Sequence, residues 1–353
     1  MGNSVNRFAA KSEAAISRSN RAFRRLTPAL GNAAKQFLSF ASAAAIGTGI
    51  VATIGFSTRA LMDYETAIQS AMAITGKTGD AFIPFEEQIK RIAKETKKSS
   101  VDIAKAFEVV GSEKPELLEN AEALGAVTES VITLSKASRD ELDVSAKNLT
   151  GTLNQFSLGA DQAERVMNVL AAGAKVGSAN ITQVSESMKN FGTVAASSNL
   201  SVEQSVALIE LMAQFGVKGA ESGTKLKGTL LKLQKAGVGY ASGQFDINDA
   251  LSEMQTKLNG LSTAQEKNAL MQKVFGAENV STGQILLGNV DAFENLTKGV
   301  TGTQTAYEMA EQNSNTLSNR LDELKNAWVN MLTGANGAGS ALDRDWETVT
   351  PFG

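Results

Sequence analysis

Helix-capping patterns recur along this sequence at short intervals, and they constrain the fold more than any other feature. A Ser followed three residues later by Asp, Glu or Gln has, or nearly has, the spacing of a capping box. The pattern occurs at Ser99 to Asp102, Ser138 to Glu141, Ser201 to Gln204 and Ser262 to Gln265. It predicts helices that start near Val101, Arg139, Val202 and Thr263.

Glycines and prolines mark further helix boundaries. A glycine just after an apolar-periodic run closes a helix in the left-handed conformation, and this pattern is found at Gly111, Gly159, Gly216, Gly237, Gly260 and Gly276. The chain has only four prolines in 353 residues: Pro28, Pro84, Pro115 and Pro351. Pro84 stands where a first-turn proline of a helix over residues 84–98 is expected.

The apolar residues between these boundaries have helical spacing. In residues 201–216 the apolar side chains Val202, Val206, Ile209, Met212 and Phe215 share one face, and Leu226, Leu230 and Leu233 do so in the next segment. The nearest approach to strand alternation, around Phe245 and Ile247, is too short to found a sheet. The sequence therefore predicts an all-α fold: a core of short to medium helices.

The composition excludes several classes of chemistry. The sequence contains no cysteine and no histidine, which removes thiol nucleophiles, disulfides, Ser-His-Asp triads and the common zinc sites. Hydrophobic residues make up 42% of the chain, enough to bury a core without metal or disulfide. A net charge of -3 indicates neither a nucleic-acid binder nor an acidic tail.

The first 61 residues differ from the rest. Residues 1–36 carry seven basic residues against the single acid Glu13, a charge of +6, and predict a basic helical arm. Residues 37–61 predict a hydrophobic helix, because Phe37 to Phe56 contains no charged residue. Its length suits a membrane span, whereas its richness in Ala, Gly, Ser and Thr suits close contact between helices. Both alternatives, a buried or self-associating helix and a transient membrane contact, stay open here.

The other end also has a distinct pattern. A long helix is predicted over about Thr303 to Leu332, where Leu317, Leu321, Leu324, Trp328 and Met331 have near-heptad spacing suited to pairing with a second copy. Residues 62–335 form the predicted helical core. Residues 336–353 are rich in glycine at first and then lack helical patterning, which predicts an unstructured tail or a truncation stub.

Two short motifs invite a catalytic interpretation. Residues 71–78 end in Gly76-Lys77-Thr78 and match a permissive phosphate-binding loop, but such a loop needs a buried strand before it, and the preceding residues have helical periodicity. Ser222 and Lys225 have the spacing of Ser-Lys acyl-transfer enzymes without the companion motifs. We predict a helix end and a helix start at these places, and neither catalytic, cofactor-binding nor metal-binding residues.

Three local signatures follow one another along the sequence. Asp63-Tyr64-Glu65 comes after a small-residue hydrophobic segment, and residues 199–212 lead into a block over residues 214–226 with Gly216, Gly219 and Gly223. Val274-Phe275-Gly276 is then followed by Leu286-Leu287. In this order the signatures resemble the core of phage tail tape measure proteins, of which the first is similar to the opening and the second to the most diagnostic block. The resemblance covers about Met62 to Leu332.

The resemblance implies a structural protein without enzymatic activity or cofactors. Such a protein occupies the lumen of the virion tail, sets tail length during assembly and leaves with the DNA at ejection. It implies self-association and, as partners, tail tube subunits, tail tip or baseplate subunits and tail assembly chaperones. It also places the protein in the host bacterial cytoplasm during assembly, with membrane contact during ejection as a further expectation. No specific nucleic-acid binding is expected.

The sequence departs from this family in length. Family members contain extended coiled regions after the core, and 353 residues in one helix would reach only ~530 Å. We therefore expect an N-terminal portion of such a protein, or an incomplete ruler. The alternative function is a membrane-inserting helical pore former or translocated effector that uses Phe37–Phe56. A nucleotide-using enzyme built on Gly76-Lys77-Thr78 is the third hypothesis.

Overall fold

The structure is a computed structural model that describes residues 49–335. Within this range the chain forms fifteen α-helices and three short 3-10 helices and no strand, which confirms the all-α prediction. The arm over 1–36, residues 37–48 of the hydrophobic segment and the tail over 336–353 lie outside the described residues. None of the described helices is long and apolar enough to span a membrane.

The α-helices follow one another with short joints. In chain order they are α3 (Gly49–Thr75), α4 (Ile83–Thr96), α5 (Ser100–Glu113), α6 (Ala121–Ser138), α7 (Leu142–Gln155), α8 (Ala163–Val176), α9 (Ile181–Ser197), α10 (Val202–Gln214), α11 (Gly219–Lys235), α12 (Ile247–Asn259), α13 (Ala264–Phe275), α14 (Val280–Gly288), α15 (Val290–Val300), α16 (Thr305–Ser314) and α17 (Leu317–Leu332). The 3-10 helices are η1 (Gly79–Phe82), η2 (Pro115–Glu119) and η3 (Ala160–Gln162).

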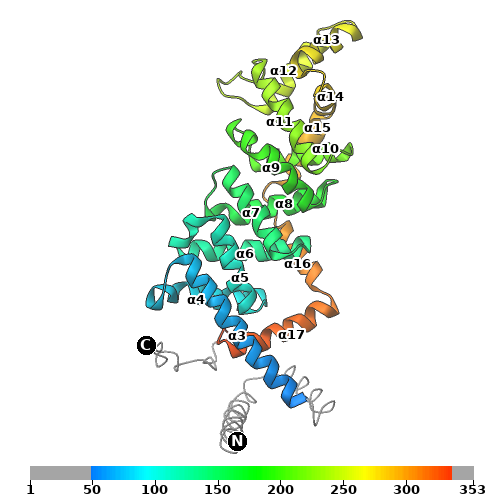
Figure 1. The fold of residues 1–353 in the computed structure, drawn as a ribbon. Coiled ribbons are helices and arrows are strands. Elements are labelled where there is room, and N and C mark those ends of the chain that lie inside the picture. Colours follow the sequence, from blue (N-terminus) through cyan, green and yellow to red (C-terminus); the bar gives the residue numbers. More distant parts are fainter. Residues whose placement is uncertain (1–48, 336–353) are drawn as a thin grey trace, which may run out of the picture.

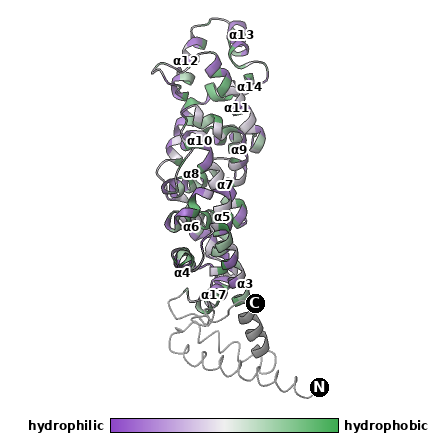
Figure 2. Cartoon of the chain, turned by 60° about the vertical axis from the view of Figure 1, so that its left-hand side comes forward, coloured by the Kyte–Doolittle hydropathy of each residue, from purple (hydrophilic) through white to green (hydrophobic). Residues whose placement is uncertain are grey.

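The helices from α3 to α11 stack into an elongated body. Each helix from α3 to α9 packs on the helix two positions further along the chain, so odd-numbered and even-numbered helices form two neighbouring columns. Figure 2 shows the same elongated body from a second direction. Stacking of this kind lets short amphipathic helices, each too small to bury its apolar face alone, build one continuous core.

A two-helix unit of about forty residues repeats through the stack. The even-numbered helices α4, α6, α8 and α10 begin at residues 83, 121, 163 and 202. Each of the first three follows a 3-10 turn and is followed by an odd-numbered partner. The repeat was not predicted from the sequence, because its units share a pattern of faces and boundaries rather than identical residues.

After α14 the chain turns and runs back along the stack. α15 packs on α8 and α10, α16 on α6 and α8, and α17 on α3, α4 and α5. In Figure 1 this returning segment descends from the α13 end to the α3 end. We call residues 290–335, which comprise α15, α16 and α17, the strap.

The core is a single cluster of buried side chains that reaches from Ala60 to Ala335. Leu226, Leu230 and Leu233 are buried as predicted. The helix α10 lies deepest, and four of its five predicted apolar residues are at most 1% exposed, whereas Phe215 is 50% exposed just beyond the helix end. More residues of α10 are buried than the one apolar face that the sequence predicts, because this helix is surrounded by α8, α9, α11 and α15.

Most of the predicted helix boundaries are confirmed. Ser99 and Ser201 cap α5 and α10, and Ser201 with Gln204 forms a complete capping box. Pro84 lies in the first turn of α4. Gly216, Gly237 and Gly276 follow their helices with the positive φ angles that favour glycine.

Other boundary predictions are wrong. Ser138 ends α6 instead of starting a helix, since Arg139 adopts the left-handed conformation and α7 begins at Leu142. The helix start predicted near Thr263 is confirmed, since α13 begins at Ala264, but its capping pair is Thr263 with Glu266, one residue beyond the predicted pair. Gly111 lies inside α5, where its missing side chain leaves room for Leu118.

Three further differences concern helix ends. Gly159 precedes η3 in an extended conformation, and Gly260 ends α12 with a right-handed φ of -72°. The long helix predicted over Thr303 to Leu332 is broken into α16 and α17 at Asn315 and Thr316. The break coincides with contacts that these helices make to the stack.

Candidate functional site

The most diagnostic sequence block, residues 214–226, forms the joint between α10 and α11 and the first turns of α11. Gly216 and Gly219 have φ angles of +80° and +59°, which turn the chain. A Cβ atom on Gly223 would lie 2.2 Å from the backbone oxygen of Ser187, so α11 approaches α9 closely only because residue 223 is glycine. The hydroxyl of Ser187 also donates to the Gly219 carbonyl at 2.6 Å.

The other two signatures are structural as well. Tyr64 on α3 is 5% exposed, and its hydroxyl donates to Glu86 Oε1 at 3.2 Å. Burial, and then the nearby Glu86 carboxylate, raise the pKa of the Tyr64 hydroxyl. Phe275 is fully buried against Gly283, where a Cβ would lie 2.7 Å from the Phe275 ring. The family-like residues thus hold helices together.

The two motifs that suggested catalysis have ordinary structural surroundings. The helix α3 leads directly into Gly76, which has a φ of +65°, and the Lys77 ammonium pairs with Glu119 at 2.6 Å. A phosphate-binding loop instead follows a strand. Ser222 lies within α11 and is fully buried, while Lys225 pairs with Glu221 one turn earlier at 3.0 Å.

A polar surface runs along one side of the stack, where each even-numbered helix turns into its odd-numbered partner. We call these four joints the loop edge: residues 97–99, 139–141, 177–180 and 215–218. Contacts about forty residues apart connect successive joints. Lys136 donates to the Thr96 carbonyl, Thr182 donates to Asp140 at 2.9 Å, and Lys218 donates to the Ser178 carbonyl.

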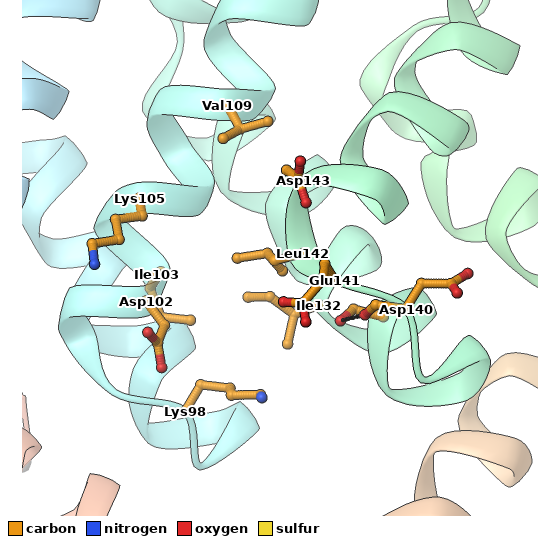
Figure 3. Close-up of a pocket in the computed structure, with 11 residues that line it drawn as sticks. Lys98, Asp102, Ile103, Lys105, Val109, Ile132, Asp140, Glu141, Leu142 and Asp143 are labelled. Atoms are coloured by element: carbon orange, nitrogen blue, oxygen red, sulfur yellow. Dashed lines mark hydrogen bonds between the residues drawn. The ribbon is translucent and has the colours of Figure 1, made fainter. Parts of the chain in front are cut away.

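A depression of about 430 Å³ opens at the first two joints of the loop edge. Figure 3 shows Lys98, Asp102 and Lys105 on the α5 side, with Asp140, Glu141 and Asp143 across the opening. Ile103, Val109, Ile132 and Leu142 supply an apolar part of its lining. Charges of both signs on an apolar floor favour contact with a protein surface over contact with a phosphate backbone.

Lys136 lies behind the second joint. Burial, together with the positive charge of Lys98, lowers the pKa of the Lys136 ammonium to about 8. The ammonium donates to a carbonyl at the C-terminal end of α4, where the helix dipole is negative. Lys136 therefore fixes the spacing between two successive units.

The third joint of the loop edge contains a buried acid that is not among the residues predicted from the sequence. Glu210 on α10 is fully buried, and its Oε2 accepts hydrogen bonds from the backbone N–H groups of Ser178 at 2.7 Å and Ala179 at 2.9 Å. Its Oε1 is buried without a hydrogen-bond partner. Burial raises the pKa of Glu210 to about 7, although the two backbone N–H groups and Lys218 act in the opposite direction.

Gly177 makes this arrangement possible, because a Cβ at residue 177 would lie 1.9 Å from Glu210 Oε2. The only sequence signal for Glu210 is an acid placed between Ile209 and Leu211 on a strongly apolar helix. That signal points to burial only when the helix is known to be covered on all sides.

The arrangement as a whole braces the joints of the stack against one another. In the part of the chain that the structure describes, no three Asp, Glu, His or Cys residues come together in a way that could hold a metal ion. The hydrogen bonds of Glu210 come from backbone N–H groups. The geometry therefore holds the joints of the stack in register and leaves charged side chains on its surface.

Comparisons with known proteins agree with the structural role of these residues. The model of a family described as phage-related minor tail protein matches residues 86–276, which run from α4 through α13. The tape measure protein of Pneumococcus phage Dp-1 is 25% identical over 282 residues, covering 75% of this chain and 24% of that protein.

A second relative is the probable tape measure protein of Escherichia phage P2, which is 24% identical over 271 residues and is matched over 70% of this chain and 33% of that protein. The chain thus spans about a quarter to a third of the length of these relatives. No solved structure matches the chain.

Proposed function

This chain belongs to the phage-related minor tail protein family, and we propose that it forms the core-bearing part of a tail tape measure protein. Its role is structural and lies in the phage tail. The finer roles that we assign to it are determination of tail length inside the tail tube and release with the DNA at ejection. We assign it no catalytic, cofactor-binding or metal-binding residues.

One observation carries the proposal: the residues that resemble the tape measure core are those that build the stack. Gly223 sets the approach of α11 to α9, and Phe275 fits against Gly283. The family match over residues 86–276 runs from α4 to α13 and so includes all of the elongated body except α3 and the start of α4. A stack that grows in one direction with each two-helix unit suits a protein that lies along a tube.

The partners follow from the same surface. We propose that tail tube subunits, tail tip or baseplate subunits and tail assembly chaperones bind the protein, with the loop edge as the contact surface. Its lysines and carboxylates surround an apolar floor, which suits protein partners. We propose no specific nucleic-acid binding.

Self-association is a further part of the proposal. Leu321 on α17 is 59% exposed, and Leu324 and Trp328 are partly exposed on the same helix. This apolar stripe suits pairing with a second copy.

The proposed organisation keeps the four segments that the sequence predicts: the arm over 1–36, the hydrophobic segment over 37–61, the core over 62–335 and the tail over 336–353. The helix α3 runs through the boundary at residues 61 and 62 without interruption. Residues 49–61 of the hydrophobic segment are therefore continuous with the first core helix. We propose the tail lumen of the virion as the location, and the host cytoplasm during assembly.

A nonsense codon at Gln88 in the gene of a phage that carries this protein tests the proposal. We expect tails to be absent or of variable length by electron microscopy, because the stack is lost, and mass spectrometry of purified wild-type tails should detect the protein. Growth in a suppressor host that restores glutamine is the control. Normal, uniform tails without the protein would overturn the proposal.

A further inference from the structure

The break between α16 and α17 lies in a stretch that has no intrinsic helix breaker. From Thr305 to Leu332 the sequence contains neither glycine nor proline. Ser, Asn and Thr at residues 314–316 disfavour a helix interior only by about 0.5 kcal/mol each relative to alanine. Propensity alone would let one helix run through the break.

The heptad pattern also continues through the break without a shift. Spacings of three and four residues connect Tyr307, Ala310, Ser314, Leu317, Leu321, Leu324, Trp328 and Met331. A stretch that encoded two independent helices would not need to keep one register across their joint. The sequence of the strap is therefore that of one helix of nearly thirty residues.

The backbone at the break leaves the helical conformation at two residues, and mainly in their ψ angles. Asn315 has φ of -80° and ψ of 39°, and Thr316 has φ of -108° and ψ of 156°. A change that is mainly in the ψ angles of these two residues would make the helix continuous. Several joints of the stack differ, since Lys97, Arg139, Ser157 and Asn199 turn the chain with positive φ angles.

Contacts with the stack hold the bend. On α16, Asn313 Nδ2 donates to the carbonyls of Lys136 at 3.0 Å and Ala137 at 2.8 Å, at the C-terminal end of α6. Asn319 Nδ2 donates at 2.6 Å to the carbonyl of Asn313, a group that the broken helix leaves without its usual partner. Thr316 Oγ1 accepts from the Asn319 N–H at 3.2 Å and caps α17.

The far end of α17 is fixed in the same way. Asn330 is 2% exposed; its Oδ1 accepts from the Ser100 N–H at 2.8 Å, and its Nδ2 donates to the Lys98 carbonyl at 2.7 Å. Asn326 Nδ2 donates to the Lys97 carbonyl at 3.1 Å. The strap is therefore bent because its amide side chains bind the C-terminal ends of α4 and α6 at two separate places.

From these observations we infer that the strap is a conformational switch: α16 and α17 are bent while docked on the stack and form one continuous helix when the docking contacts release. Straightening replaces the two helix ends at residues 313–319 with regular hydrogen bonds and presents the whole heptad stripe on one face. Release also uncovers the faces of α6 and α8 on which α16 packs.

Spin-label distance measurements test this inference, and the absence of cysteine in the chain makes the labelling clean. Labels are placed at exposed positions through Gln304→Cys and Lys325→Cys. In a continuous helix these residues, 21 positions apart, are separated by about 32 Å along the helix axis. We expect a shorter distance in the otherwise unaltered chain and a narrow distribution near that value in Asn313→Ala/Asn330→Ala.

Two further variants separate the role of the helix cap from that of the docking contacts and control for the loss of an amide contact elsewhere. Thr316→Ala leaves the docking contacts intact while removing the cap of α17, and it should shift part of the population to the same long distance. Asn190→Ala removes a comparable amide contact, to the Ala220 carbonyl at 3.1 Å, outside the strap and should leave the distance unchanged.

Circular dichroism verifies that each variant retains its helical stack. An unchanged short distance in Asn313→Ala/Asn330→Ala would overturn the inference, since the bend would then be intrinsic. A broad distribution would overturn it as well, since the released strap would then melt.

Discussion

Replacing Glu210 with glutamine should raise the free energy of unfolding at pH 8. At pH 4.5 the same replacement should change it very little. The buried carboxyl has a pKa raised from 4.5 to about 7. Below pH 4.5 the group is protonated in both folded and unfolded chains, so its full contribution to stability is present. As the pH rises to 7 the unfolded chain ionises first, and stability is lost until the folded carboxyl also ionises.

The magnitude follows from the shift. A difference of about 2.5 pH units at 1.36 kcal/mol per unit gives an upper bound of about 3 kcal/mol. Glutamine keeps an oxygen for the N–H groups of Ser178 and Ala179, and its NH₂ group takes the place of the protonated Oε1, which has no partner. The variant therefore mimics the protonated acid at every pH.

Urea unfolding of both proteins from pH 4.5 to pH 8 measures the effect, and the difference between the two curves removes the contributions of all other groups. Glu203→Gln is the matched control on the same helix. Its carboxylate faces Arg165 at 3.5 Å, so neutralising it removes an ion pair and should not stabilise the protein at pH 8. A stability difference for Glu210→Gln that does not change with pH would refute the reasoning.

Three other changes test the packing, the strap and the hydrophobic segment. Gly223→Ala should lower the free energy of unfolding, measured by calorimetry, by about 1–3 kcal/mol, because the added Cβ meets the Ser187 backbone. Gly151→Ala is the control: residue 151 faces open space within α7, so this change should be neutral or stabilising. Equal effects of the two changes would contradict the close approach of α9 and α11. Ser100→Cys with Thr333→Cys should oxidise to a disulfide that thiol titration detects, since the two hydroxyl oxygens lie 2.7 Å apart, whereas persistently free thiols would argue against docking of α17. Deletion of Phe37–Phe56 should abolish any leakage of dye from liposomes if that segment inserts into membranes, and unchanged leakage would exclude insertion by it.

Much of the helical structure could be predicted from sequence because its signals are local. A cap such as Ser201 with Gln204 acts over three residues, and the apolar period of Leu226, Leu230 and Leu233 acts over two turns. The prediction failed where tertiary context changed a local signal. Ser138 begins no helix because α6 continues up to it and Arg139 then turns the chain.

The candidate surface could be anticipated only in part. The block from Gly216 to Gly223 was identified through its resemblance to a family. The structure explains why glycine is needed at residue 223, because α11 contacts the backbone of α9 there. The loop edge and Glu210 could not be predicted. Their partners lie some 30 to 40 residues away, and a single sequence gives no sign of which joints meet.

The sequence by itself determined that this chain is helical, where several of its helices begin and which faces are apolar, since these properties follow from capping, turn conformation and period within a few residues. The tertiary structure alone decided that the helices stack in units of about forty residues, that Glu210 is buried and that the strap runs back along the stack. Tertiary contacts also divide the helix predicted over Thr303 to Leu332 into α16 and α17. Contacts between residues up to about 230 positions apart, such as Asn330 with Ser100, stabilise that bend against the local preference for a continuous helix.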